Sequence, residues 1–206
     1  MLKIWGRKNS VNVKKALWCA EELGLRYERL DAGREHGVVD TPEYRKLNPN
    51  GLVPTIEDDG FVHWESHAIV RYLAAKYGGG SLWPDDLRVR AEADRWMDWV
   101  VSTLNPAMRA AFWGLVRTPP AERDAKAISE SVARSSEVLA TVDAALAHRL
   151  HIAGETFTMG DIPLGCHVYN WMLLPIERRP LPHLEAWYQR LTQRAAYRKV
   201  VMLPLS

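Results

Sequence analysis

Residues 48–77, NPNGLVPTIEDDGFVHWESHAIVRYLAAKY, are the stretch that decides the fold. Pro54 interrupts a strand that would otherwise read VPTIE. Proline in a strand belongs at an edge, at a bulge or in a cis bend. A cis bend after Val53 would turn the N–H and C=O of Val53 out of the sheet, where an extended ligand could pair with them. Asp58-Asp59-Gly60 is a hairpin turn signal, so Phe61–Trp64 is the expected partner strand.

The same stretch ends in a helix that begins at Glu65-Ser66. Apolar residues from Ile69 to Tyr77 recur at helical spacing. The N–H groups and the hydroxyl at such a helix start favour a bound carboxylate, and Glu65 beside them can take an ammonium group. A free peptide edge, a carboxylate pocket and an acidic side chain together predict a receptor for a small zwitterionic peptide.

Upstream of this stretch the pattern predicts strand, helix and strand. The expected elements are a strand at residues 2–6, a polar loop at 7–12, a helix at 13–23 stopped by Gly24, and a strand at 26–30. Such a unit pairs its two strands in parallel. Thr41 and Pro42 start one helical turn, as N-cap and first helical residue. The order βαβαββα predicts a thioredoxin-like α/β domain at residues 1–78.

Downstream, residues 79–86 read as a linker, because glycines and Pro84 separate two helical patterns. Residues 87–206 form the expected all-α helical domain. It should begin with a long helix at 87–116 that Pro106 kinks or breaks, followed by a helix that restarts at Thr118 and runs toward residue 150. Thr158 and Asp161 form a capping-box pattern, flanked by Phe157 and Ile162 at the staple positions, so another helix starts there. Two shorter helices follow, at 183–192 and 195–202.

Composition excludes several classes of protein. The formal net charge is +2 with both signs mixed, which gives no footprint for nucleic acid. No apolar stretch approaches the roughly 20 residues of a membrane span, and the N-terminus does not read as a signal peptide. Cys19 and Cys166 lie far apart in helical patterns, as buried reduced thiols do, and there is no zinc-ligand spacing. We therefore expect a cytoplasmic protein that binds no metal.

Together, Val53-Pro54, the hairpin, Glu65-Ser66 and the helix that follows resemble the glutathione-binding half of the cytosolic glutathione transferases. The capping box at 158–161 resembles the start of their second domain's buried helix, so the resemblance covers essentially the whole chain. It implies that Val53 before Pro54 holds the cysteinyl unit of glutathione, and that Glu65 and Ser66 hold its γ-glutamyl end. Glutathione would serve as co-substrate.

Such an enzyme must hold the thiol as a thiolate. Lowering a thiol pKa from about 8.5 to roughly 6.5 takes ~2.7 kcal/mol, which one charge-assisted hydrogen bond and a helix N-terminus can supply. Ser10 and Asn12 both lie between the first strand and the first helix. Ser10 falls where theta-like, serine-type bacterial members of the family carry their catalytic serine, and Asn12 is the alternative donor. Tyrosine-type and cysteine-type mechanisms are disfavoured, because Trp5-Gly6-Arg7 contains no tyrosine and Cys19 lies too far along the chain.

Several positions depart from the family pattern. Leu52 stands where theta-like enzymes often carry a lysine, so the glycine carboxylate of glutathione needs another cation, for which His36 and Lys14 are candidates. Asp94 falls where some relatives send an aspartate across the dimer to the γ-glutamyl ammonium, although a surface helix would also place a carboxylate there. The resemblance further implies a homodimer, packed through the third and fourth helices.

The second substrate would lie between the domains, against the long helix. Residues available to line this cleft are Trp96, Trp99, Met108, Phe112 and Trp113, although Trp and Met at helical spacing also suit a core. The predicted function is conjugation of glutathione to small hydrophobic electrophiles, with peroxide reduction by the same thiolate as an additional activity. The alternatives are a non-catalytic binding protein of the same fold and a glutathione-dependent isomerase.

Overall fold

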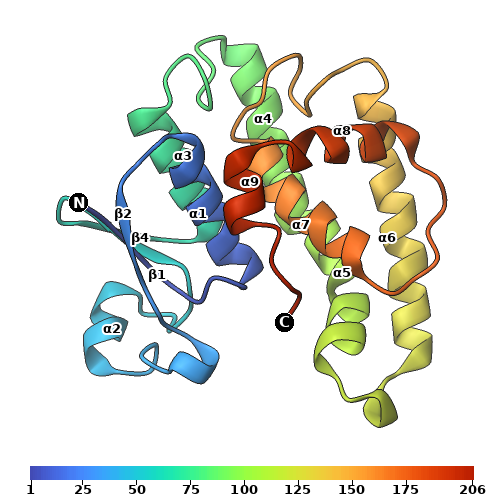
Figure 1. Ribbon diagram of the computed structural model, residues 1–206, viewed down its shortest axis with the longest axis horizontal. Helices are drawn as coiled ribbons and strands as arrows, with labels where there is room; N and C mark the ends of the chain where they lie inside the picture. The colour runs from blue at the N-terminus through green and yellow to red at the C-terminus, as the bar shows by residue number, and fades with distance from the viewer.

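The computed structural model describes residues 1–206 (Figure 1). A four-stranded mixed sheet forms the N-terminal part of the molecule. Its strands are β1 (Leu2–Trp5), β2 (Tyr27–Leu30), β3 (Thr55–Asp58) and β4 (Phe61–Trp64). Their order in the sheet is β2-β1-β3-β4. The β1–β2 pair is parallel, with Leu2 opposite Tyr27, whereas β3 runs antiparallel to both β1 and β4. The predicted thioredoxin-like order is confirmed.

Three helices complete this part: α1 (Val11–Glu22), α2 (Pro42–Leu47) and α3 (Ser66–Tyr77). Helix α1 begins two residues before the predicted start. Ser10 is its N-cap, in an extended conformation, and the main-chain oxygen of Ser10 accepts a hydrogen bond from the Lys14 N–H. Gly24 ends the helix with a φ of +64°, and the Leu25 N–H reaches back to Ala20 O in a Schellman arrangement. Asn12 is therefore a helix residue rather than a loop residue.

Six helices form the rest of the chain: α4 (Leu87–Trp99), α5 (Asn105–Phe112), α6 (Ala125–Leu146), α7 (Asp161–Leu173), α8 (Pro182–Thr192) and α9 (Ala195–Val200). Of the kink or break predicted at Pro106, the break is absent: the chain stays helical through a π-helical turn, Val100–Leu104, directly before it. Such a turn absorbs the lost hydrogen bond of a proline. Helix α6 starts at Ala125 rather than at Thr118, because the carboxylate of Asp124 caps the Ala127 N–H at 2.9 Å.

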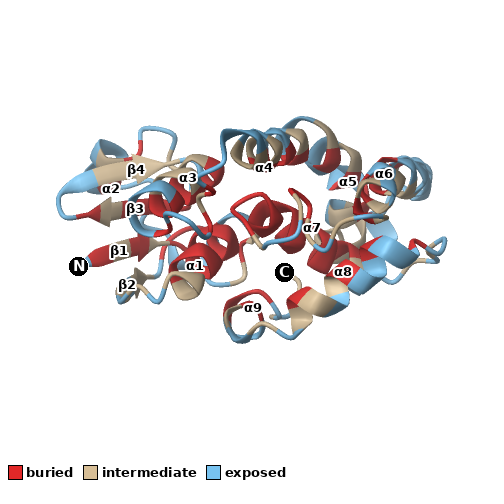
Figure 2. Cartoon of the chain, turned by 90° about the horizontal axis from the view of Figure 1, so that it is seen from above, coloured by how far each residue is buried: buried red, intermediate tan, exposed pale blue.

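Helix α7 lies at the centre of the helical part. All of its residues from Asp161 to Trp171 are buried, as the red colouring in Figure 2 shows. The carboxylate of Asp161 accepts the Thr158 N–H at 2.9 Å, as the predicted capping box requires. It also accepts the Ile152 N–H at 3.0 Å and the Trp187 indole N–H at 2.9 Å. One carboxylate therefore joins the start of α7 to the preceding loop and to α8.

One hydrophobic core runs through both parts. Trp18 of α1 is fully buried, with its ring 4.6 Å from that of Tyr197 in α9 and 5.4 Å from that of Phe157. A Cβ at Gly165 of α7 would lie 2.8 Å from the Trp18 ring, so only glycine allows this approach. The contact fixes the sheet part against the helical part.

None of the helices is both long and apolar enough to span a membrane. No group of three or more His, Cys, Asp or Glu side chains is arranged to hold a metal ion. Cys19 and Cys166 are both buried and free, as predicted.

Candidate active site

A cavity of about 430 Å³ opens where the start of α1, the loops after β1 and β2, and helix α5 meet. Its walls are formed by Arg7, Ser10, Val11, Asn12, Gly33, Arg34, Val39, Gly51, Leu52, Val53, Asn105, Met108, Arg109, Phe112, Trp113, Arg117, His167 and Asn170. The cavity therefore brings together residues from both parts of the chain, including both candidates for thiol activation.

Ser10 and Asn12 present two unused donors to this cavity. Ser10 is only 7% exposed, and its hydroxyl forms no hydrogen bond within the chain, not even a cap on α1. The side-chain oxygen of Asn12 accepts a hydrogen bond from Lys15 Nζ at 3.0 Å. An ammonium group only donates, so this contact fixes the amide orientation and leaves the NH₂ of Asn12 free. The geometry suits either side chain as a donor to a bound sulfur.

Val53 offers the free peptide edge expected from the sequence. The bond Val53–Pro54 is cis, and neither the N–H nor the C=O of Val53 has a hydrogen-bond partner in the chain. The adjacent carbonyl of Leu52 is held by the Tyr44 hydroxyl at 2.7 Å and the Asn48 amide at 2.9 Å. The loop is therefore anchored directly beside the unpaired N–H and C=O of Val53. Leu52 itself is 63% exposed and lines the cavity.

Glu65 and Ser66 lie at the start of α3, outside the cavity walls. Ser66 is buried, and its hydroxyl has no partner in the chain. The first N–H groups of a helix also lack partners within the helix. Glu65 is exposed and has a φ of +70°, a conformation that non-glycine residues rarely adopt away from functional positions. The arrangement presents anion-binding donors beside an available carboxylate.

Three other predicted residues lie outside the cavity. His36 is exposed and lies 3.4 Å from Asp31 and 3.5 Å from Glu35. Lys14 is buried beneath the C-terminal segment, with Nζ 3.4 Å from Leu203 O, and burial lowers its pKa to about 8. Asp94 pairs with Arg71 of its own chain at 2.5 Å.

The predicted electrophile residues divide into two groups. Met108, Phe112 and Trp113 line the cavity, where Trp113 is 47% exposed. Trp96 and Trp99 do not line it: their rings pack edge to face at 5.1 Å, and Trp96 belongs to the core. Phe112 of helix α5 and Trp113 of the π-helical turn Trp113–Arg117 thus supply an aromatic wall to the cavity that Ser10 also lines.

Sequence reasoning missed the charged residues of the cavity, which are Arg7, Arg34, Arg109 and Arg117. One signal was available: Arg7 follows β1 and Arg34 follows β2, and the carboxyl ends of two parallel strands meet at one edge of the sheet. Arg109 and Arg117 are two helical turns apart and so share a face. His167 and Asn170 of α7 were also missed, since a helix buried all round shows no functional side.

The charged side chains that line the cavity are all positive, because no Asp or Glu lines it. Burial, together with the positive charges of Arg34 and Arg7, lowers the pKa of Arg117 to about 10. Burial and Arg34 likewise lower the pKa of Arg7. Burial and the nearby charge of Lys15 lower the pKa of His167 to about 3, so its ring is neutral near pH 7. Positive charge therefore dominates the site.

Comparisons with known proteins agree along the whole chain. Residues 9–76 match the family described as glutathione S-transferase, N-terminal domain, and residues 125–190 match glutathione S-transferase, C-terminal domain. The chain is 49% identical to glutathione S-transferase GstB of Escherichia coli K12, with all of both chains covered. A theta class glutathione S-transferase from Xanthomonas axonopodis pv. citri, crystallised with glutathione bound, matches with a TM-score of 0.96 and 54% identity over 100% of this chain and 99% of that one. The chain therefore belongs to the glutathione S-transferase family.

Proposed function

We propose that this protein transfers the thiolate of glutathione to hydrophobic electrophiles. The observation that carries the proposal is the unpaired main-chain N–H and C=O of Val53, a residue that shares one cavity with the free donors of Ser10 and Asn12. An extended peptide bound along Val53 places its thiol between these donors and the aromatic wall of α5.

Glutathione lies across three groups in this proposal. The N–H and C=O of Val53, held by the bend at Pro54, pair with the cysteinyl unit. Ser66 and the start of α3 take the γ-glutamyl carboxylate, and Glu65 takes the adjacent ammonium group. For the glycine carboxylate we propose Arg34 with His36, because both lie on the loop after β2 and Arg34 lines the cavity beside Leu52. Lys14 is a poorer candidate, because its ammonium group is buried against Leu203.

Ser10 is the proposed thiol donor, and Asn12 is the alternative. A hydroxyl or amide hydrogen directed at sulfur stabilises the anion and so lowers the thiol pKa. The start of α1 adds positive potential to the same place. The sulfur then attacks the electrophilic carbon: a C–S bond forms, the bond to the leaving group breaks, and the leaving group departs with the electron pair. Met108, Phe112 and Trp113 are the proposed contacts of the electrophile.

We also propose how the protein assembles and where it is located. A homodimer packed through α3 and α4 would bring Asp94 to the partner subunit's γ-glutamyl site, and Asp94 is 45% exposed although it pairs with Arg71. Reduction of hydroperoxides by the same thiolate is proposed as an additional activity. The free buried thiols of Cys19 and Cys166 favour a cytoplasmic location.

The direct test is a panel assay of the purified protein with glutathione. Conjugation of 1-chloro-2,4-dinitrobenzene, reduction of cumene hydroperoxide and isomerisation of a cis-keto acid are measured against the uncatalysed rates. The proposal expects conjugation well above background. Binding to a glutathione column without turnover of any substrate would identify a non-catalytic binding protein instead, and turnover of the cis-keto acid alone would identify an isomerase.

A further inference from the structure

Arg7 is a buried cation that lacks an anion. Its side chain is 7% exposed, it lines the cavity, and its Nε has no hydrogen-bond partner. None of the ion pairs in the chain includes it. An unpaired charge is costly to bury, so proteins pair such charges or bind a ligand of opposite sign. The unsatisfied guanidinium therefore marks the cavity as a place for an anionic group.

The arginines of the cavity act as a cluster. Arg7, Arg34 and Arg117 all line the one cavity. Burial lowers the pKa of both Arg7 and Arg117, Arg34 lowers both further in the same direction, and Arg7 does so for Arg117. Glu35 acts on Arg7 in the opposite direction, but its carboxylate lies 3.5 Å from His36 and forms no ion pair with an arginine. No Asp or Glu side chain among the residues that line the cavity compensates the repulsion inside the cluster.

Bound glutathione cannot neutralise this cluster alone. Its γ-glutamyl end carries its own two charges to Glu65 and Ser66, outside the cavity walls. The proposed function assigns the glycine carboxylate to Arg34 with His36 and the thiolate to Ser10. Glutathione therefore brings no carboxylate to Arg7 or to Arg117.

Arg117 packs against two of the aromatic residues that are proposed to contact the electrophile. Its guanidinium lies 4.4 Å from the centre of the Trp113 ring and 5.1 Å from that of Phe112. Its Nε and Nη2 lie 3.3 Å from the main-chain oxygen of Ser206, and its Nη1 has no partner. A ring that packs on Phe112 and Trp113 would therefore carry its substituents next to this charge.

We propose that the preferred electrophiles of this enzyme are anionic, with a carboxylate or a similar group bound by Arg117 and Arg7. This inference rests on the proposed transferase function and narrows its substrate class. For a halogenated nitrobenzoate, the sulfur of glutathione forms a C–S bond at the halogen-bearing carbon. Halide leaves with the electrons of the C–halogen bond, while the carboxylate stays unchanged on the arginines.

Two electrophiles that differ in charge test the proposal. We would compare 4-chloro-3,5-dinitrobenzoate with 4-chloro-3,5-dinitrobenzamide, correcting each for its uncatalysed rate with glutathione. Wild-type kcat/KM should favour the carboxylate by about tenfold or more, as expected for a charge-assisted hydrogen bond. The preference should fall as salt is added. Calorimetry with the unreactive pair 3,5-dinitrobenzoate and 3,5-dinitrobenzamide measures binding without turnover.

Arg117→Gln removes the charge on the aromatic wall, and Arg117→Lys retains it. Arg117→Gln should reduce the ratio of kcat/KM for the carboxylate over the amide to near unity, without changing the KM for glutathione. Arg117→Lys should retain most of the wild-type ratio. Arg134→Gln is the matched control, because Arg134 is exposed on α6 and pairs with Glu137 away from the cavity. Arg7→Gln repeats the test, with circular dichroism to confirm that the buried substitution folds.

The possible outcomes distinguish a failure of this inference from a failure of the proposed function. Equal rates for both electrophiles, or a preference that survives Arg117→Gln, would overturn the inference while leaving the transferase function intact. An increase of the KM for glutathione in Arg117→Gln, without loss of preference, would assign the arginines to the glycine carboxylate and also overturn it. If neither electrophile reacts, the proposed function fails, and equal calorimetric affinity for the two unreactive compounds would then refute the anion site itself.

Discussion

At the scale of single residues, the proposed active site relies on donors that the fold leaves unpaired. Ser10 caps α1 by position only, and its hydroxyl remains available. Asn12 is different, because Lys15 holds its oxygen and the ammonium of Lys15 is itself 2.9 Å from His67 Nε2. Burial lowers the pKa of Lys15 to about 8. The charge that orients Asn12 is thus partly lost above that pH, whereas Ser10 has no such dependence.

Ser10→Ala should raise the pKa of bound glutathione by about 1–2 pH units, because hydrogen bonding to the anion lowers the pKa of an acid. Thiolate absorbance in the ultraviolet, followed against pH, measures this directly, with conjugation rates alongside. Asn12→Ala is the comparison variant. A shift in Asn12→Ala with none in Ser10→Ala would transfer the role to Asn12, and no shift in either would leave activation to the helix start.

Glu65→Ala should weaken glutathione binding by about 1.5–3 kcal/mol, the value of a charge-assisted hydrogen bond. Because Glu65 is exposed to solvent, we expect the lower part of that range. Isothermal titration calorimetry measures the change. Glu28→Ala on β2 serves as the control, since Glu28 is exposed and has no role in the site. Unchanged affinity in a folded Glu65 variant would contradict the assignment.

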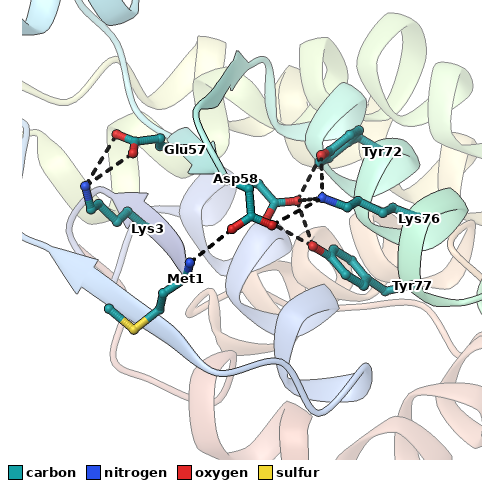
Figure 3. Close-up of polar contacts among 8 residues, drawn as sticks. Met1, Lys3, Glu57, Asp58, Tyr72, Lys76 and Tyr77 are labelled. Atoms are coloured by element: carbon teal, nitrogen blue, oxygen red, sulfur yellow. Dashed lines mark hydrogen bonds and ion pairs between the residues drawn. The ribbon is translucent and has the colours of Figure 1, made fainter.

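At the scale of elements, the hairpin of β3 and β4 shows how local signals and distant partners combine. The turn residues Asp59 and Gly60 both have positive φ, as the two-residue turn requires. Asp58, just before them, is only 3% exposed and accepts hydrogen bonds from Tyr72, Lys76 and Tyr77 at 2.8–3.0 Å (Figure 3). The turn is therefore fixed to α3.

This cluster makes stability depend on pH. Burial alone would raise the pKa of Asp58, but the hydrogen bonds from Lys76, Tyr72 and Tyr77 outweigh it and hold the pKa below its usual value. A lowered pKa contributes stability that is complete above the unfolded value of about 3.9 and is lost as the pH falls through the folded one. Acid should therefore weaken this contact only below about pH 4.

Asp58→Asn should lower the free energy of unfolding by about 1.5–3 kcal/mol at pH 7, since the charge-assisted hydrogen bonds are lost. The difference from wild type should shrink below about pH 4, where the wild-type carboxylate is protonated. Urea unfolding at several pH values measures both. Asp59→Asn is the matched control: Asp59 is 69% exposed and pairs with the amino group of Met1 at 3.2 Å, so its loss should cost under about 1 kcal/mol.

Sequence patterns predicted those elements whose signals are local. The hairpin turn and the stop at Gly24 follow from neighbouring residues and are confirmed. Of the capping box, the hydrogen bond that Asp161 accepts from the Thr158 N–H is present, although Gly160 occupies the N-cap position. Patterns could not show that Asp161 also binds Trp187, because a hydrogen bond over 26 residues leaves no periodic trace. The predicted start of α6 at Thr118 was wrong for a related reason. Pro119 and Pro120 favoured an earlier start, but the side chain of Asp124 provides the cap.

The candidate site was predictable to a similar degree. The residues that lie next to recognisable motifs, such as Ser10, Val53 and Ser66, are where the sequence placed them, although their roles stay predictions. The arginine cluster needed the tertiary structure, since Arg7, Arg34 and Arg117 come from three distant segments. Trp96 was a poor cleft candidate because helical spacing does not distinguish a core face from a cavity face.

At the scale of the whole molecule, assembly is the main open prediction. We expect a homodimer in which α3 and α4 pack across a two-fold axis, the commonest oligomer symmetry. Light scattering at micromolar concentration should give a mass near twice that of one chain. Asp94→Asn should then raise the KM for glutathione, because the carboxylate would act across the interface. A mass near that of a single chain would remove both the dimer and this role of Asp94.

The contact of Trp18 with Gly165 limits how this protein can be recombined. Trp18 comes from the part of the chain that would bind glutathione, whereas Gly165 and Tyr197 come from the part that would bind the electrophile. A chimaera that joins one relative's first half to another's second half would inherit only one side of this contact. Any larger residue at position 165 would then meet the indole ring. Exchange of substrate preference between relatives should therefore succeed by grafting the residues of α5 rather than by exchanging halves.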